Sequence, residues 1–160
     1  MKNKDFDWKK YLLKCLESTN YCSIATVDKN GVWSNPVYFA WDKTFNLYFI
    51  SQPHVRHMQN IKKDSHVAVS IYATNQKGDY VKGIQLEGKA RIIENDGKQD
   101  EFFYAYKVYY TRTGEYKENE AIVMNNEWMF VKVTPDKIYY FNNEIFGEVR
   151  QEIPWDKIKK

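Results

Sequence analysis

The segment SQPHVRHMQNI, residues 51–61, places two histidines and an arginine within four residues. His54 and His57 stand three positions apart, a spacing at which two side chains on one helix could share a metal ion. Arg56 and His57, together with Ser51, could instead hold a phosphate group at a helix N-terminus. The same pattern is also typical of an ordinary surface helix, so the surrounding elements must decide among three interpretations.

The metal interpretation lacks ligands. A structural zinc site takes four protein ligands and a catalytic one takes three. The third histidine, His66, opens the next predicted strand, and the chain has no HExxH or CxxC motif. Cys15 and Cys22 lie seven positions apart, which is typical of reduced, partly buried thiols rather than of a disulfide framework. We therefore predict no metal site.

Strand signals come before the segment, and a helix is predicted over it. Tyr21–Val27, Trp33–Trp41 and Asn46–Ser51 have strand composition and are separated by the turns DKNG and DKT. Pro36 has no N–H, so its strand must be an edge, be bulged or leave its N–H side free. The helix is predicted over SQPHVRHMQNIKKD, with Pro53 in its first turn.

Further strands are predicted after this helix. HVAVSIY, residues 66–72, alternates apolar and polar residues, and in VKGIQLEGKARII the apolar Ile84 and Leu86 flank Gln85 on a wet face. Two closing strands are predicted around Glu127–Val133 and Lys137–Phe141, with the turn TPD between them.

Two more helices complete the predicted elements. DFDWKKYLLKCLEST has apolar residues at helical spacing, with Asp5 or Asp7 as N-cap. Gly97–Tyr110 carries a wide aromatic stripe, and Gly114 is expected to terminate that helix.

These elements predict one domain over residues 1–160 of a mainly β (α+β) class. Strands joined by short turns indicate an antiparallel barrel of six to seven strands, with an N-terminal helix and two inserted helices. The aromatic content of 17% favours an aromatic-rich β core, and a net charge of +3 spread along the chain argues against a nucleic-acid partner. No apolar run has the length of a membrane span, so a soluble cytoplasmic protein is expected.

The ordered segments ATVDKNGVWSNPVYFAWD, LYFISQPHVRHMQNI, HVAVSIY and GIQLEGKARII resemble the FMN-binding split barrels. This is the superfamily of pyridoxamine 5′-phosphate oxidase, and the resemblance covers residues 21–94. The RH pair, the IQ segment and the closing FNNEIFG look closest to an uncharacterised bacterial branch. The resemblance implies a split barrel that forms a homodimer, with each flavin near the interface.

The resemblance also implies a set of FMN-binding residues. Arg56 stands where the family has the arginine that takes the phosphate, whereas His57 departs from the usual lysine. A bound phosphate would favour the protonated form of this histidine. The implied FMN-binding residues are Val37, Tyr38, Ile50, Ser51, Arg56, His57 and Gln85.

The expected activity is flavin-dependent electron or hydride transfer to an unidentified small molecule. Pyridoxamine phosphate oxidation itself is not expected, because the segment FGEVRQEIPWDKIKK has only Arg150 and no histidine to hold the substrate phosphate. No residue is assigned a catalytic role. Two alternatives stay open: a haem-binding split barrel that uses His54, His57 and the aromatics, and a non-catalytic barrel that binds a protein or nucleic acid.

Overall fold

The structure is a computed structural model that describes residues 6–73, 78–97, 100–114 and 117–158. Its strands are β1 (Tyr21–Asp28), β2 (Gly31–Tyr38), β3 (Ala40–Trp41), β4 (Leu47–Ser51), β5 (His66–Tyr72), β6 (Lys82–Ile93), β7 (Met129–Asn142) and β8 (Gln151–Glu152). Its helices are α1 (Trp8–Glu17), α2 (Arg56–Lys63), α3 (Asp100–Thr113), α4 (Lys117–Met124), α5 (Asn143–Phe146) and α6 (Trp155–Ile158).

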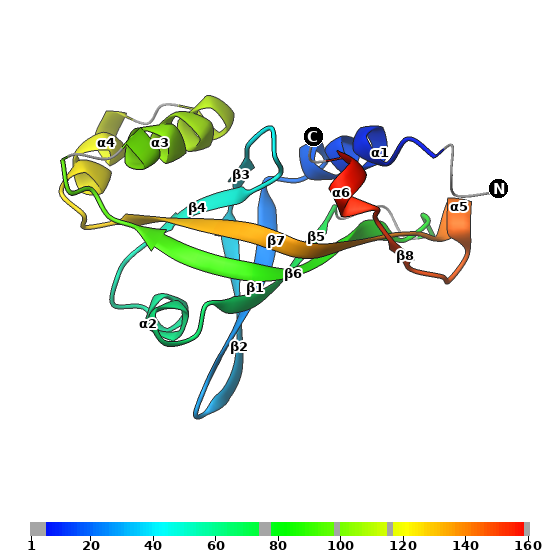
Figure 1. The fold of residues 1–160 in the computed structure, drawn as a ribbon, viewed down its shortest axis with the longest axis horizontal. Helices are drawn as coiled ribbons and strands as arrows, with labels where there is room; N and C mark the ends of the chain where they lie inside the picture. The colour runs from blue at the N-terminus through cyan, green and yellow to red at the C-terminus, as the bar shows by residue number, and fades with distance from the viewer. Residues whose placement is uncertain (1–5, 74–77, 98–99, 115–116, 159–160) are drawn as a thin grey trace.

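All pairings between strands are antiparallel, in the order β2-β1-β5-β6-β7-β4-β3, with β8 added to β7. Only Phe39 separates β2 from β3 along the chain, yet these two strands stand at opposite ends of the sheet order. The sheet must therefore curl until its two edges approach each other (Figure 1). This confirms the predicted split barrel, and the seven strands of the continuous path agree with the predicted six to seven, with the two-residue β8 as an unpredicted addition.

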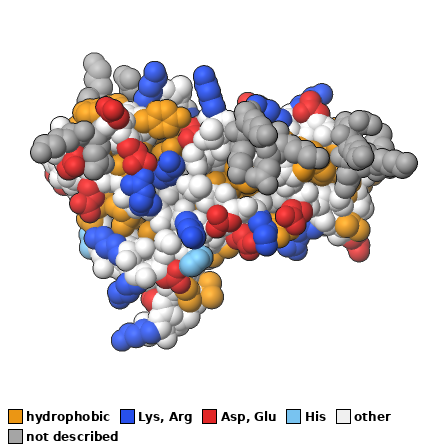
Figure 2. Space-filling model, in the orientation of Figure 1, with side chains coloured by type: hydrophobic (Ala, Val, Ile, Leu, Met, Phe, Trp, Pro, Cys, Tyr) orange, Lys and Arg blue, Asp and Glu red, His pale blue; other side chains and the backbone are white. Residues whose placement is uncertain are grey.

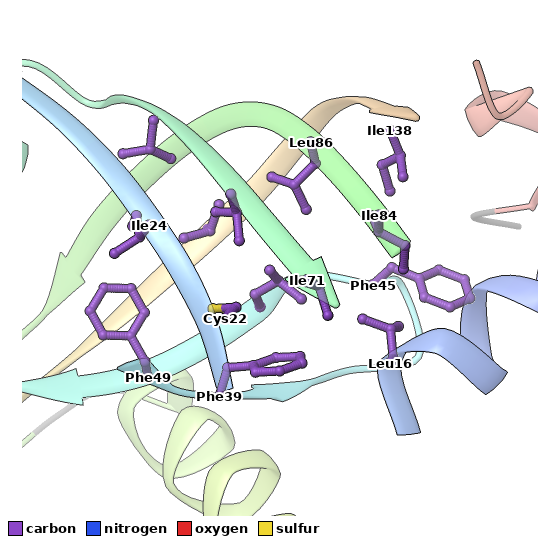
Figure 3. Close-up of a cluster of buried hydrophobic side chains, with 14 of the residues drawn as sticks. Leu16, Cys22, Ile24, Phe39, Phe45, Phe49, Ile71, Ile84, Leu86 and Ile138 are labelled. Carbon is purple, nitrogen blue, oxygen red and sulfur yellow. The ribbon is translucent and has the colours of Figure 1, made fainter. Parts of the chain in front are cut away.

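The concave face of the sheet carries the main core. Strand residues with period-two spacing point inward together, and Leu16 of α1 meets them at one end (Figure 3). A second apolar cluster lies beneath α3 and α4, around Phe130, Phe102 and Tyr48. The two clusters use opposite faces of β4 and β7, which places α3 and α4 outside the barrel (Figure 1).

Two predicted helices form close to where the sequence places them. Asp7 caps α1 by accepting a hydrogen bond from Lys10 N at 3.0 Å, whereas Asp5 lies outside the described residues. α3 begins at Asp100 and ends before Gly114, whose φ of +82° a residue with a side chain rarely adopts. α4, α5, α6 and β8 were not predicted.

The prediction for α2 is wrong at its start. Pro53 was expected in the first helical turn, but the helix begins at Arg56. Val55 N donates to Gln52 O, so Pro53 instead occupies the second position of a turn, which its fixed φ favours. Val55 is therefore the extended N-cap residue, with φ −73° and ψ 156° and no side-chain capping bond.

The prediction of two closing strands is also wrong, because β7 runs without a break through the expected TPD turn. Pro135 is accommodated within β7 by a register shift between Glu87 and Gly88 of β6, where Gly88 pairs with Pro135. A Cβ at Gly88 would lie 2.3 Å from Thr134 O, so only glycine allows the strands to pass this closely.

Candidate functional site

The candidate site is formed by two strand edges that lack a neighbour. Within the described part of the chain, β2 pairs only with β1, and Phe49–Ser51 of β4 pair only with β7. β2 and β4 contact each other, so these free edges lie across the opening of the barrel. We call them the split edges. The edge position of β2 confirms the prediction made from Pro36.

The first residues of α2 connect both split edges, and we call Val55, Arg56 and His57 the α2 head. Arg56 reaches the β1–β2 hairpin, where Nε donates to Asp28 Oδ2 at 2.9 Å and Nη2 donates to Asp28 Oδ1 at 3.0 Å. The guanidinium also stacks over Trp33, with Cζ 4.8 Å from the ring centroid. The hydrogen bonds from Arg56 hold the pKa of the Asp28 carboxyl below its usual value.

His57 makes the connection to β4. Its Nε2 lies 2.8 Å from Ser51 Oγ, and both side chains are buried. Burial lowers the pKa of His57, because the charged imidazolium is poorly solvated there. Before any ligand binds, the neutral imidazole is therefore favoured, and its ring faces the protein interior beside Phe49.

The buried side-chain amide of Asn60 adds hydrogen bonds to the Asp28–Arg56 pair. With its oxygen facing Thr26 Oγ1 at 3.0 Å, the Asn60 side chain donates to Arg56 O at 3.1 Å and to Asp28 Oδ2 at 3.3 Å. Asn60 is buried, so these bonds fix α2 against the hairpin. Sequence reasoning missed Asp28 and Asn60, because a turn aspartate and a helical asparagine carry no local sign of this contact.

The other predicted residues of β2 and β4 contribute backbone rather than converging side chains. Val37 is buried and faces the core, whereas Tyr38 points to the opposite face, with its ring 5.3 Å from that of Tyr21. Ile50 packs with the second cluster, beside Trp128. Their shared feature is that all three lie on the split edges.

Gln85 is not brought together with the α2 head. Ile84 and Leu86 point into the core, so Gln85 lies on the outer face, in register with Ser70 and Tyr139. This confirms the face predicted for it. Its Oε1 is nevertheless buried and has no hydrogen-bond partner among the described residues, which is costly for a polar atom unless a donor reaches it.

No metal cluster forms in the described ranges, where no three His, Cys, Asp or Glu side chains come together as ligands. His54 is exposed, and His66 Nδ1 pairs with Asp64 at 2.7 Å. Two hollows of about 490 and 510 Å³ lie elsewhere, on the outer face and beside α1, and none of the seven predicted residues lines them. None of the helices described has both the length and the apolar character needed to cross a bilayer.

Several solved structures share this fold. A heme binding protein from Mycobacterium smegmatis aligns with a TM-score of 0.72 and 14% identity over 91% of this chain and 57% of that one, so this chain spans less than two thirds of its length. A FAD-binding protein from Mesorhizobium loti gives 0.63 and 14% identity over 81% and 89% of the two chains. The General Stress Protein 26 from Bacillus anthracis gives 0.65 and 17% identity over 92% and 100%.

At these identities the similarity shows the fold alone, and no curated protein sequence matches the chain. The family is shown by a sequence model described as pyridoxamine 5′-phosphate oxidase, which matches residues 9–142. That range contains both split edges, the α2 head and Gln85. The chain belongs to the pyridoxamine 5′-phosphate oxidase family of split barrels.

Proposed function

We propose that the protein binds FMN along the split edges, with the FMN phosphate at the α2 head, and that it transfers electrons or hydride to a small molecule other than pyridoxamine phosphate. One observation carries this proposal. Two strand edges with free backbone groups meet a helix N-terminus that bears Arg56, in a chain of this family. A FAD-binding protein among the similar structures supports a flavin as the class of ligand.

The donors and acceptors present fit a flavin phosphate. The first N–H groups of an α-helix have no partner inside the helix and favour an anion. Of the five N–H groups of a guanidinium, Arg56 uses two on Asp28, and the others have no acceptor among the described residues. The split edges add backbone N–H and C=O groups that suit the polar edge of a flavin ring.

The chain's own residues would hold and orient the ligand. When bound, FMN supplies a ring that accepts and returns electrons. Val37 anchors β2 in the core and the Ser51–His57 bond fixes the end of β4, so both split edges are held in place. α2 packs against β1 and β2, which fixes the α2 head relative to the β2 edge. We assign no catalytic acid or base.

We also propose that two copies pair through the outer face of the sheet. Exposed apolar side chains gather there and on the hairpin, with Val32 at 74%, Tyr21 at 60% and Tyr72 at 52% exposure. Figure 2 shows hydrophobic side chains on the projecting hairpin and mixed charges over the body. A second copy would pack over the outer face that carries Gln85 and would bring Gln85 towards the flavin of its partner.

A titration tests the proposal directly. Adding the purified protein to FMN is expected to quench the flavin fluorescence and to shift the flavin absorbance band at about 450 nm. Light scattering during gel filtration is expected to give twice the chain mass. Absence of both spectral changes at excess protein would exclude the FMN proposal. If the protein instead shifts the Soret band of added haemin, the haem alternative is supported. The similarity to the heme binding protein from Mycobacterium smegmatis is the reason to make this measurement.

A further inference from the structure

The Asp28–Arg56 pair has a property that the proposed function does not explain. A phosphate site gains affinity from uncompensated positive charge, yet the guanidinium of Arg56 is already bound at two points by a carboxylate. The pair is partly sheltered, since the Asp28 side chain is 15% exposed and that of Arg56 is 36% exposed. Its charges are therefore less screened than those of a fully exposed surface pair.

Asp28 is fixed in this position by several donors. Besides Arg56, its Oδ1 accepts from Asn30 N at 2.7 Å in the hairpin turn, and its Oδ2 accepts from the Asn60 amide at 3.3 Å. Two elements, the hairpin turn through Asn30 and α2 through Arg56 and Asn60, thus hold one carboxylate beside the α2 head. Asp28 cannot swing away when an anion arrives without losing these bonds.

The α2 head has no second charge to replace the one that Asp28 compensates. Val55 is apolar, and His57 points inward to Ser51, where burial favours its neutral form. The two lysines of the helix, Lys62 and Lys63, lie in its last turn, and Lys63 also lowers the pKa of the Asp28 carboxyl, though less than Arg56 does. The attraction for a phosphate dianion therefore comes from the helix N–H groups and from a guanidinium whose charge is already matched.

We propose that Asp28 determines the phosphate affinity of the α2 head: its carboxylate compensates Arg56, so the site takes a phosphate monoester as an exchangeable ligand. This inference rests on the proposed function for the identity of the ligand. Asp28 acts in two opposing ways, because it orients Arg56 and it repels the phosphate. Repulsion prevails, since a dianion meets the full negative charge of Asp28, whereas Trp33 and Asn60 continue to position the α2 head without it.

Asp28→Asn is the decisive variant, because asparagine keeps the acceptor for Asn30 N while it removes the charge. Asp64→Asn is its matched control. Asp64 follows the other end of α2 and also accepts a hydrogen bond from the N–H two residues on, that of His66, at 3.0 Å. The two variants change the net charge equally. Thermal unfolding followed by circular dichroism verifies that each is folded.

Affinities for FMN and for riboflavin, which lacks the phosphate, are measured by fluorescence quenching, and inorganic phosphate is titrated as a competitor of FMN and separately by ³¹P NMR. We expect Asp28→Asn to bind FMN about 10-fold more tightly than the wild type and to bind inorganic phosphate more tightly as well. Its affinity for riboflavin should be unchanged, and Asp64→Asn should match the wild type for all three ligands. Equal or weaker FMN and phosphate binding by folded Asp28→Asn would overturn the inference. If no variant binds either flavin, the FMN proposal fails, and the ³¹P titration alone decides the role of Asp28.

Discussion

His57 Nε2 lies 2.8 Å from Ser51 Oγ, and this buried contact joins the first turn of α2 to the last residue of β4. Sequence reasoning expected both residues to face a phosphate. In the structure they face each other, so their first role is to hold the end of β4 against α2. The role predicted for them towards FMN stays a prediction.

The buried His57 gives a prediction for stability against pH. Burial lowers its pKa in the folded state below the unfolded value of 6.5, so the unfolded chain takes up a proton first as the pH falls. The contribution of His57 to the free energy of unfolding is therefore complete above about pH 6.5 and is lost as the pH falls through the folded pKa. Urea denaturation between about pH 8 and about pH 5 measures this loss. His57→Gln, which cannot titrate, is expected to show a shallower slope, and an identical slope would contradict the prediction.

Removal of the Arg56 guanidinium is expected to weaken FMN binding. Arg56→Ala deletes the charge-assisted donors at the α2 head and leaves the Asp28 carboxylate unpaired beside the phosphate. We expect a loss of about 1.5–3 kcal/mol in binding free energy, measured by fluorescence titration. Lys62→Ala removes a cation from the last turn of the same helix and serves as control. Equal affinities for Arg56→Ala and the control would remove Arg56 from the phosphate site.

Substitution of Gln85 is expected to change stability and FMN affinity in opposite directions. Gln85→Met keeps the volume but removes a buried acceptor that has no donor in the described part of the chain. We expect the free energy of unfolding of the flavin-free protein to rise by about 1 kcal/mol, while FMN affinity falls. Leu86→Met, the neighbouring core position on the other face, is the control for packing changes. Lower stability of Gln85→Met would show that the oxygen is satisfied by a donor.

Arg112 is expected to be important for stability rather than for binding. Its Nε donates to Phe39 O at 3.1 Å, and its Nη2 donates to Leu16 O at 2.9 Å and to Thr19 O at 2.7 Å. The guanidinium also lies 3.7 Å from the ring centroid of Trp41. One side chain of α3 is thus hydrogen-bonded both to the end of α1 and to Phe39, the residue at which the chain crosses from one sheet edge to the other.

Arg112→Lys cannot reproduce this fork of donors. We expect it to lower the free energy of unfolding by about 2–3 kcal/mol, measured by urea denaturation. Arg91→Lys alters an exposed ion pair with Glu101 and should change the same quantity by less than about 0.5 kcal/mol. Equal effects of the two substitutions would show that the carbonyl contacts of Arg112 add nothing to stability.

The sequence alone determined the features that depend on near neighbours. Alternation around Gln85 placed that residue on the outer face, Pro36 required an edge or bulged strand, and Asp7 marked the start of α1. The order of segments was also enough to identify the family, which the match over residues 9–142 shows. These signals work because side-chain period, missing donors and helix caps act within a few residues.

Only the tertiary structure decided how the candidate site is assembled. Asp28 and Arg56 are 28 positions apart in the chain and meet because the sheet curls and α2 packs against the β1–β2 hairpin. The continuity of β7 likewise depends on the close approach of Gly88 to Thr134, which neither segment signals by itself. A carboxylate in a turn has the same local pattern whether it faces solvent or an arginine. Its effect on the α2 head is therefore fixed by the three-dimensional packing and not by the sequence around it.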